Sequence, residues 1–323
     1  MIIALDTSTS HASIALVRDE DSPHDHPRGG PAPDDPILAE LTWEIGRRHS
    51  QELVPRLQWL LAVCGASPAD LTAVAVALGP GSFNGIRVGV ATAKALAFAR
   101  DLPLYGSSTL DVIAWGQRQA AALAELTAAA SDYETPEVSH ATRAPGPRAT
   151  ICAALDAGRG EVYAARYVVA LPPARPDRAP TSISGGTDAP AAILVASGLW
   201  RTAEPVVASP MDLAATTPGP VLLCGEWRPA TGDALTAAFG PRALFAPALG
   251  GRRASWLAAL ALDRRARGEA DEPATMEPRY LRRPAITRSA RHPMAAADDL
   301  GPVGLQLAVG EEGDKGETRA LRH

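Results

Sequence analysis

Three short polar segments carry residue types that bind phosphate or a metal ion. Asp6-Thr7-Ser8-Thr9 and Asp156-Ala157-Gly158 each follow an apolar segment, and Gly79-Pro80-Gly81-Ser82 separates an apolar segment from a helix-compatible one. Carboxylates bind divalent cations, and the unpaired N–H groups at a helix start bind anions. These patterns predict a nucleotide- or phosphate-facing role for nine residues: Asp6, Thr7, Ser8, Thr9, Gly79, Gly81, Ser82, Asp156 and Gly158.

Each of these segments also has a purely structural explanation. Asp, Thr and Ser side chains in a tight turn hydrogen-bond to the backbone of that turn, so the first segment needs no ligand. The glycine-rich segment is not a Walker A loop, because Ile86-Arg87 stand where that loop requires Lys and Ser or Thr. Its glycine spacing also differs from the dinucleotide-binding fingerprint. The three segments by themselves leave a binding role and a structural role open.

The elements around the two Asp-containing turns predict a duplicated hairpin. Residues 2–5 and 12–17 are short apolar strands on either side of the first turn, and residues 150–155 and 162–167 flank the second turn in the same way. The repeated order of strand, Asp, short polar turn and returning strand indicates an internal repeat. We therefore expect two α/β lobes, with the two aspartates at equivalent positions.

Shifts in composition set the expected boundaries of these lobes. Segments rich in Pro, Gly and charged residues interrupt the apolar pattern, as loops do. We expect an N-terminal lobe at 1–107 with a polar insertion at 18–36, a C-terminal lobe at 108–288 with Pro-rich insertions at 131–148 and 171–190, and a disordered tail at 289–323.

Two helices are expected in the N-terminal lobe, at about 50–63 and 85–100. Apolar residues of the first recur at helical spacing and form one apolar face. The second is apolar on nearly all sides, and such a helix is either deeply buried or shared with a partner. Small residues spaced by four form a ridge on it that lets another helix approach closely. The residues concerned are Leu53, Leu57 and Leu60 in the first helix, and Gly85, Gly89 and Ala93 in the second.

The composition is that of a globular protein and excludes several functions. A net charge of −5 over 323 residues argues against a broad nucleic-acid-binding surface. The three cysteines lie far apart among apolar residues, which predicts buried, reduced thiols, and the seven histidines form no His-x-x-x-His pair for a catalytic metal. The absence of a signal-peptide pattern and of a membrane-spanning apolar run predicts a cytoplasmic protein.

Five segments together resemble the TsaB family. They are LDTSTSHASIALV from Leu5, RRHSQELVPRL from Arg47, ALGPGSFNGIRVGVATAKALAFARDLPLYGSSTLDVIA from Ala77, ALDAGRGEVYAARY from Ala154 and EPRYLR from Glu277. The resemblance implies an α/β, two-lobed actin-like fold, as in sugar kinases and Hsp70-like ATPases, with duplicated β-hairpin-containing lobes. It also implies a partner protein in the threonylcarbamoyladenosine (t6A) modification of tRNA at adenosine 37.

TsaB proteins resemble degenerate paralogues of TsaD, the subunit that transfers the threonylcarbamoyl group to tRNA. TsaD-type enzymes carry a metal-binding His pair, but the corresponding segment here, Gly106–Ala114, contains no histidine. The resemblance therefore implies a non-catalytic scaffold or activator without a metal, which pairs with a TsaD-type subunit through its two N-lobe helices. The expected interface residues are Leu53, Leu57, Leu60, Gly85, Ile86, Gly89, Ala93 and Leu96.

The same resemblance implies further partners. A TsaE-type ATPase is expected in a larger complex, and a homodimer when the chain is alone. No resident cofactor is expected, and ATP or ADP would bind only weakly or with a partner's help. Contact with tRNA is expected to be indirect or weak, with candidate contacts at Arg279, Arg282, Arg283, Arg288 and Arg291.

A different function remains open at this stage. A stand-alone actin-like ATPase or phosphotransferase would bind Mg-ATP between the lobes through Asp6 and Asp156. Proteolysis, in contrast, requires a metal or an activated nucleophile. Ser82 lies in no Gly-x-Ser-x-Gly elbow, and no Cys has basic neighbours, so glycoprotease activity is not expected.

Overall fold

The computed structural model describes residues 1–19, 36–46, 48–131, 150–169, 193–246 and 252–282. These residues lie within one compact unit, Met1–Arg283. Most of the three expected insertions and the whole of the expected tail fall outside the described residues. Within the described ranges, no helix is long and apolar enough to cross a membrane.

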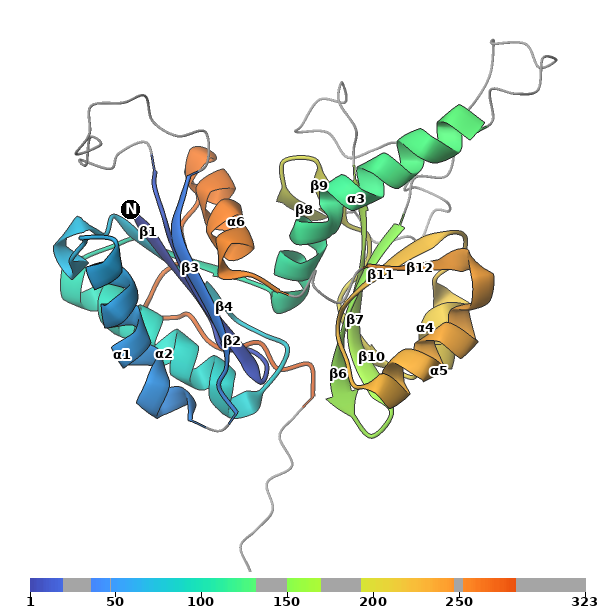
Figure 1. Ribbon diagram of the computed structural model, residues 1–323, viewed down its shortest axis with the longest axis horizontal. Coiled ribbons are helices and arrows are strands. Elements are labelled where there is room, and N and C mark those ends of the chain that lie inside the picture. The colour runs from blue at the N-terminus through green and yellow to red at the C-terminus, as the bar shows by residue number, and fades with distance from the viewer. Residues whose placement is uncertain (20–35, 47, 132–149, 170–192, 247–251, 283–323) are drawn as a thin grey trace, which may run out of the picture. The chain divides into compact units, whose positions relative to one another are not determined.

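The first sheet has five strands in the order β3-β2-β1-β4-β5 (Figure 1). Strands β1, β2 and β3 form an antiparallel meander, and β4 and β5 run parallel to β1. Each parallel strand is reached through a helix, as parallel pairing requires. The strands are β1 (Ile2–Asp6), β2 (His11–Val17), β3 (Ile37–Glu44), β4 (Ala73–Ala77) and β5 (Leu104–Ser107).

The second sheet repeats this plan. Its hairpin β6–β7 is antiparallel, β11 and β12 run parallel to β6, and β9 pairs with β7 as β3 pairs with β2. Strand β8 pairs with β9, and β10 pairs with β7. The shared order confirms the two hairpin-containing lobes predicted from the sequence. The strands are β6 (Thr150–Gly158), β7 (Glu161–Val169), β8 (Ile193–Ala196), β9 (Leu199–Arg201), β10 (Val206–Ala208), β11 (Val221–Glu226) and β12 (Ala243–Phe245).

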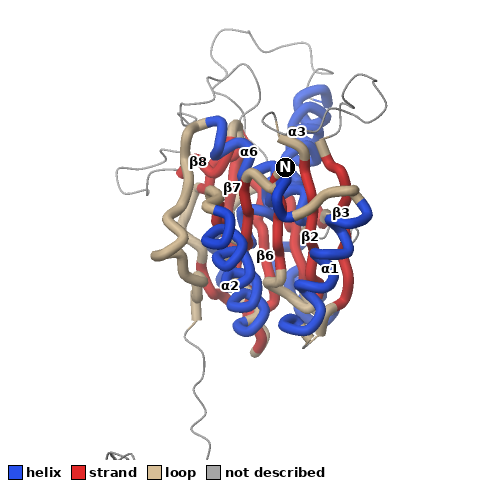
Figure 2. Tube along the Cα trace, turned by 90° about the vertical axis from the view of Figure 1, so that its left-hand side faces the viewer, coloured by secondary structure: helices blue, strands red, loops and turns tan. Residues whose placement is uncertain are grey.

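Helices cover both faces of each sheet. Helices α1 and α2 cover one face of the first sheet, and α6 covers the other; α3 covers one face of the second sheet, and α4 and α5 cover the other (Figures 1 and 2). Two short 3₁₀ helices lie at Pro68–Asp70 and Gly240–Arg242. The α-helices are α1 (His49–Val63), α2 (Phe83–Arg100), α3 (Thr109–Ser131), α4 (Pro210–Thr216), α5 (Pro229–Phe239) and α6 (Ala254–Ala266).

Residues 2–5 of β1 and all of β4 are apolar, because both faces of these strands are buried under helices. In β1, Ile3 and Leu5 belong to the core under α1 and α2, whereas Ile2 and Ala4 belong to the core under α6. All four side chains are inaccessible to solvent. This two-sided burial explains why the sequence shows an apolar run here rather than an alternating pattern.

Helices α3 and α6 pack closely against each other and join the two lobes. A Cβ atom on Gly116 of α3 would overlap the indole ring of Trp256 of α6, so only glycine fits at this crossing. Buried residues of both helices share one core cluster with the facing sides of both sheets. The lobes therefore have a common hydrophobic core.

Helix α6 lies on the first sheet, although the expected lobe boundaries put all of 108–288 in the C-terminal lobe. Helix α6 packs against β1 and β2 of the first sheet. The segment after it stays there too, since Lys94 of α2 donates to the carbonyl oxygens of Ala274 and Met276 at 3.2 and 3.1 Å. The small residues of α6 fit the Ala-rich face of the first sheet, a match between distant segments that the local pattern does not reveal.

Candidate functional site

The β1–β2 turn holds the first candidate carboxylate inside the protein. The Asp6 side chain is fully buried, and its Oδ1 accepts hydrogen bonds from the Ser8 N–H at 3.0 Å and the Ser8 hydroxyl at 2.6 Å. Thr7 is buried as well, and its hydroxyl donates to the Gly85 carbonyl oxygen at 2.7 Å. Asp6 and Ser8 therefore hydrogen-bond to each other within the turn, and Thr7 attaches the turn to α2.

Asp6 also has a cationic partner that the sequence did not indicate. The guanidinium of Arg252 forms an ion pair with Asp6 and approaches Glu226 at 3.4 Å. Its Nη2 donates to the Thr9 hydroxyl and to the His11 carbonyl oxygen, both at 2.6 Å. The Thr9 hydroxyl donates in turn to Glu226 at 2.7 Å. Arg252 therefore connects the hairpin of the first lobe with the end of β11 in the second.

The glycine-rich segment packs against the same hairpin. A Cβ on Gly81, whose φ is +153°, would overlap the Ser8 carbonyl oxygen, and the Ser82 N–H donates to that oxygen at 2.6 Å. Ser82 is the N-cap of α2, because its hydroxyl accepts from the Gly85 N–H at 3.2 Å. Gly79 has a φ of +99° and lies under the Arg279 carbonyl oxygen. The glycines here permit close packing of the chain on itself.

The second candidate carboxylate, Asp156, is held by residues of its own lobe. It accepts hydrogen bonds from Arg228 Nε at 2.7 Å and Nη2 at 3.0 Å, from the Thr231 hydroxyl at 2.9 Å and from the Gly158 N–H at 2.8 Å. Partial burial alone would raise the pKa of Asp156, but these hydrogen bonds outweigh burial and lower the pKa to about 2. The carboxylate is therefore ionised and already paired at neutral pH.

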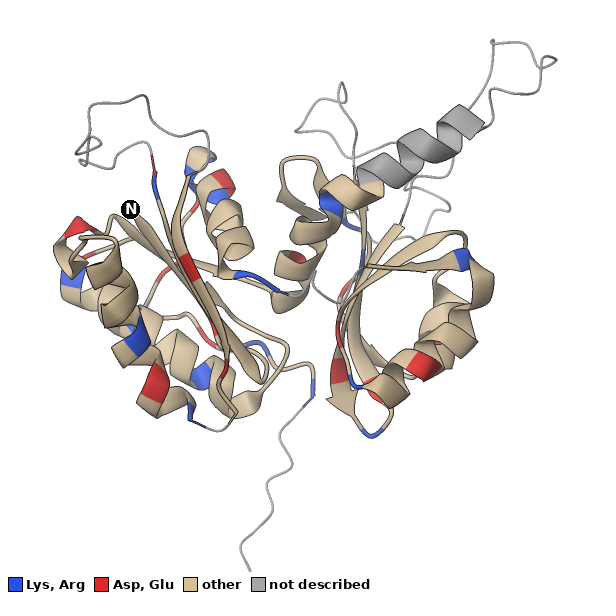
Figure 3. Cartoon of the chain, viewed as in Figure 1, with Lys and Arg blue, Asp and Glu red and all other residues tan. Residues whose placement is uncertain are grey.

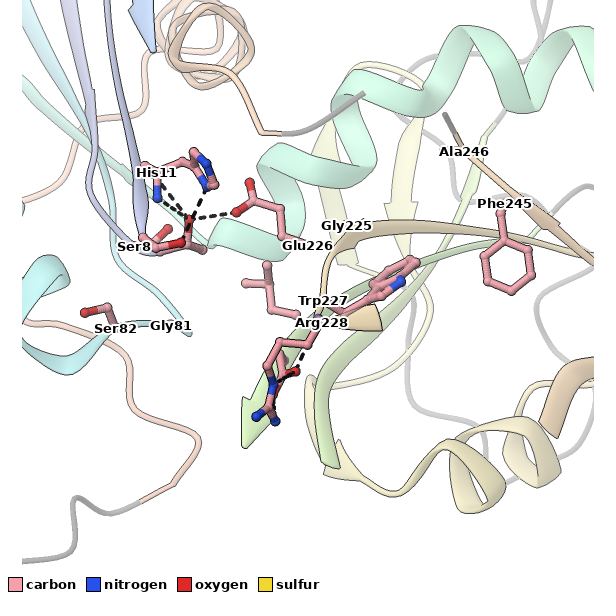
Figure 4. Close-up of a pocket in the computed structure, with 14 residues that line it drawn as sticks. Ser8, His11, Gly81, Ser82, Gly225, Glu226, Trp227, Arg228, Phe245 and Ala246 are labelled. Carbon is pink, nitrogen blue, oxygen red and sulfur yellow. Dashed lines mark hydrogen bonds and ion pairs between the residues drawn. The ribbon is translucent and has the colours of Figure 1, made fainter. Parts of the chain in front are cut away.

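A pocket of about 660 Å³ lies between these two hairpins. The first lobe contributes hydroxyls and backbone from the β1–β2 turn and the glycine-rich segment. The second lobe contributes residues near the ends of β6, β11 and β12 and the segment after β11 (Figure 4). The rings of Trp227 and Phe245 lie edge to face with centroids 6.4 Å apart. The lining residues are Ser8, Thr9, Ser10, His11, Gly81, Ser82, Leu155, Asp156, Gly225, Glu226, Trp227, Arg228, Phe245 and Ala246.

The structure brings five of the nine predicted residues to this pocket: Ser8, Thr9, Gly81, Ser82 and Asp156. The other four do not line it, because Asp6 and Thr7 are buried behind it, Gly79 packs under the C-terminal segment, and Gly158 supports Asp156. Whether any of the nine contacts a phosphate stays a prediction.

Sequence reasoning did not single out several residues that shape the pocket. Glu226 ends strand β11, and Trp227 and Arg228 follow it directly; the carboxyl end of a parallel strand is the usual place for a binding segment. That rule was available from the sequence. For Arg252 no such signal existed, because Arg253 stands next to it and only the contacts distinguish the two.

The pocket can make polar and aromatic contacts, but its charged side chains are largely paired with one another or with Arg252. Its titratable lining comprises His11, the carboxylates Asp156 and Glu226 and the guanidinium of Arg228, which is committed to Asp156. Among the described residues, no group of three or more His, Cys, Asp or Glu side chains could hold a metal ion. The arrangement suits an uncharged or weakly charged planar group better than a polyanion.

The predicted interface residues of α1 and α2 need correction, since the structure turns seven of the eight inward. A Cβ on Gly89 would overlap the Thr7 hydroxyl, and a Cβ on Gly85 would overlap the Thr7 carbonyl oxygen. The glycine ridge thus accommodates this chain's own β1–β2 turn rather than a helix of another protein. The seven buried residues are Leu53, Leu57, Leu60, Gly85, Ile86, Gly89 and Ala93; Leu96 is half-buried.

Other residues of these helices form the solvent-facing side. Trp59 and Phe98 are 55% and 61% exposed, which is unusual for such large apolar side chains. Val63 lies one turn after Trp59 and is exposed, and the exposed residues Ala91 and Ala95 lie on the turns before Phe98. We call these five residues the outer apolar surface of α1 and α2.

Comparison with known proteins identifies relatives of this chain. The family model described as TsaD, tRNA N6-adenosine threonylcarbamoyltransferase, matches residues 40–132. The tRNA threonylcarbamoyladenosine biosynthesis protein TsaB of Bacillus subtilis is 35% identical over 113 residues, which are 35% of this chain and 43% of that protein. The protein of the same name from Escherichia coli is 32% identical over 167 residues, 51% of this chain and 54% of that protein.

The similarity extends to solved structures. YeaZ from Pseudomonas aeruginosa superposes with a TM-score of 0.58 at 23% identity, covering 87% of this chain and 99% of that chain. At this identity the match shows the fold, which is the two-lobed actin-like fold expected from the sequence. The chain spans about half the length of the curated relatives that it matches in sequence.

Proposed function

The chain belongs to the TsaB (YeaZ) family, and we propose that it acts as a partner subunit in t6A modification of tRNA. In this proposal it carries no catalytic group of its own and pairs with a TsaD-type subunit in the cytoplasm. The names of its relatives support the pathway. The site geometry supports the accessory role, because both candidate carboxylates are already paired within the chain.

The observation that carries the partner proposal is the outer apolar surface of α1 and α2. Contiguous exposed apolar side chains mark interaction sites on proteins. Trp59 and Phe98 are the large side chains that typically anchor an interface, and the small Ala91 and Ala95 allow a partner helix to approach closely. We therefore assign the partner contact to this surface instead of to the glycine ridge, which faces inward.

Co-purification with a TsaD-type protein tests this assignment. Trp59→Glu and Phe98→Glu place a charge in the proposed contact, and each is expected to weaken the complex about tenfold or more. Met211→Glu is the matched control, because Met211 is 67% exposed but lies on α4 of the other lobe. The variants should unfold at the wild-type temperature, since all three side chains are exposed.

If the Trp59 and Phe98 variants bound the partner as well as the Met211 variant, the outer apolar surface would not be the interface. The pathway assignment has its own test, in which tRNA modification is reconstituted with and without this chain. A TsaD-type subunit that is fully active alone would refute the partner role. The two experiments fail independently of each other.

The remaining partners stay predictions within this proposal. Indirect contact with tRNA is supported by the distribution of charge, since Lys and Arg lie scattered among Asp and Glu over both lobes (Figure 3). Arg282 is also occupied within the chain, donating to the Ala157 carbonyl oxygen at 3.1 Å and pairing with Glu161. Arg283, Arg288 and Arg291 lie outside the described residues. A TsaE-type ATPase and a homodimer have no described contact that tests them.

A further inference from the structure

Arg252 lies where the chain passes between the lobes. It comes shortly after β12 of the second sheet and two residues before α6, which covers the first sheet. Although arginine is rarely buried, Arg252 is only 4% exposed. A guanidinium in this position must be paired, because taking an unpaired charge out of water is strongly unfavourable.

Its partners come from both lobes. In the first lobe, Arg252 pairs with Asp6 and donates to Thr9 and to the His11 carbonyl oxygen. In the second lobe, it approaches Glu226, which also accepts from Thr9. One guanidinium therefore faces two carboxylates that belong to different sheets. Without it, these carboxylates would face each other with no described cation between them.

An actin-like fold implies a metal-bound nucleotide at the aspartate of the first hairpin, and the residues around Asp6 do not fit that group. A magnesium ion needs near-ideal octahedral space around its carboxylate ligand. Asp6 is inaccessible to solvent. Its Oδ1 already accepts a hydrogen bond from the Ser8 hydroxyl and forms the ion pair with Arg252. The pocket in front of it presents Glu226 and Asp156, which repel phosphates, and its one guanidinium is paired with Asp156.

We propose that Arg252 is an internal counter-ion that takes the place of the metal-bound phosphate at Asp6 and holds the two lobes together without a nucleotide. The two hairpins are then held together by a guanidinium of the chain itself, and this contact does not depend on the supply of nucleotide. The pocket in front of Asp6 keeps the carboxylates of Glu226 and Asp156 and the rings of Trp227 and Phe245.

Chemical rescue tests this role. Arg252→Ala leaves a guanidinium-shaped hole between Asp6 and Glu226. The thermal midpoint is expected to fall by roughly 6–15 °C, because the buried carboxylate of Asp6 and the half-buried carboxylate of Glu226 lose their cation. Millimolar guanidinium chloride should restore part of this loss, whereas potassium chloride at the same concentration should not. Arg253→Ala is the matched control: it pairs with Glu40, whose side chain is 9% exposed, but its own side chain is 55% exposed.

Equal midpoints for the two alanine variants, or a fall that guanidinium does not reverse, would overturn the proposal. Calorimetry of the wild-type chain with Mg-ATP tests the proposal independently, even if Arg252→Ala does not fold. We expect no magnesium-dependent heat at Asp6. Micromolar Mg-ATP binding that is lost in Asp6→Asn would show that Asp6 is open to a metal and that Arg252 does not replace one. Both measurements use the isolated chain and do not depend on a partner.

Discussion

Replacing Gly89 with alanine should destabilise the protein, although alanine is the better helix former. Gly89 is buried in α2, and the new methyl group would overlap the hydroxyl oxygen of Thr7. Thr7 is itself buried, and its hydroxyl donates to the Gly85 carbonyl oxygen at 2.7 Å. The side chain can therefore turn away from the methyl group only by breaking this bond.

Three contributions set the size of the effect. Overpacking a buried site costs about 1–3 kcal/mol, and leaving the Thr7 hydroxyl unpaired costs about 1–3 kcal/mol. The gain in helix propensity from glycine to alanine returns about 1 kcal/mol. The expected net loss of stability is about 1–5 kcal/mol. At roughly 2–4 °C per kcal/mol for a protein of this size, the thermal midpoint should fall by about 2–20 °C.

A double-mutant cycle with Thr7→Ala isolates the clash. Thr7→Ala removes the hydroxyl that the new methyl group meets, so Gly89→Ala in that background should be neutral or stabilising by up to about 1 kcal/mol. Urea denaturation of the four proteins gives the free energies of unfolding. The m-values should agree, because no variant changes the extent of the core.

The reasoning would be refuted if Gly89→Ala cost the same in both backgrounds, or if it raised the stability of the wild-type chain. Either result would mean that the Gly89 face of α2 is not packed on the β1–β2 turn. The glycine ridge would then again be free for a partner helix, as the sequence pattern had suggested.

Two further predictions concern titratable groups. Burial raises the pKa of all three thiols, that of Cys152 to about 12 and that of Cys224 well above its usual value. Cys64 is half-buried and the other two are buried, so a disulfide reagent at pH 8 should label Cys64 first in the native protein and all three thiols after unfolding. Equal labelling rates of the three native thiols would contradict this. Because the folded pKa of Asp156 lies near 2, below its unfolded value, its pairing stabilises the protein above pH of about 4 and is lost as the pH falls towards 2. Arg228→Ala should move the carboxyl titration of Asp156 upward in NMR spectra, and an unchanged titration would show that this arginine does not hold the carboxylate.

The local sequence was sufficient for the hairpins and for the duplicated plan of the two lobes. Strand pairs around Asp6 and Asp156 are set by short apolar segments and turn residues, which act over fewer than twenty residues. The long helices were also predictable, since α3 and α6 follow helical periodicity over three or more turns. Strands of three or four residues, such as β8 to β10, were not, because so short a segment carries no period of its own.

The sequence by itself therefore determined which residues share a face and which turns carry polar groups. The tertiary structure alone decided which face points inward. On α2, apolar and small residues surround the helix, so the direction of Gly89 was set by the turn that packs on it, about eighty residues earlier in the chain. Arg252 and Arg253 show the same for two identical neighbours. Arg252 is enclosed by Asp6 and Glu226, whereas Arg253 pairs with Glu40 and keeps a side chain that is 55% exposed.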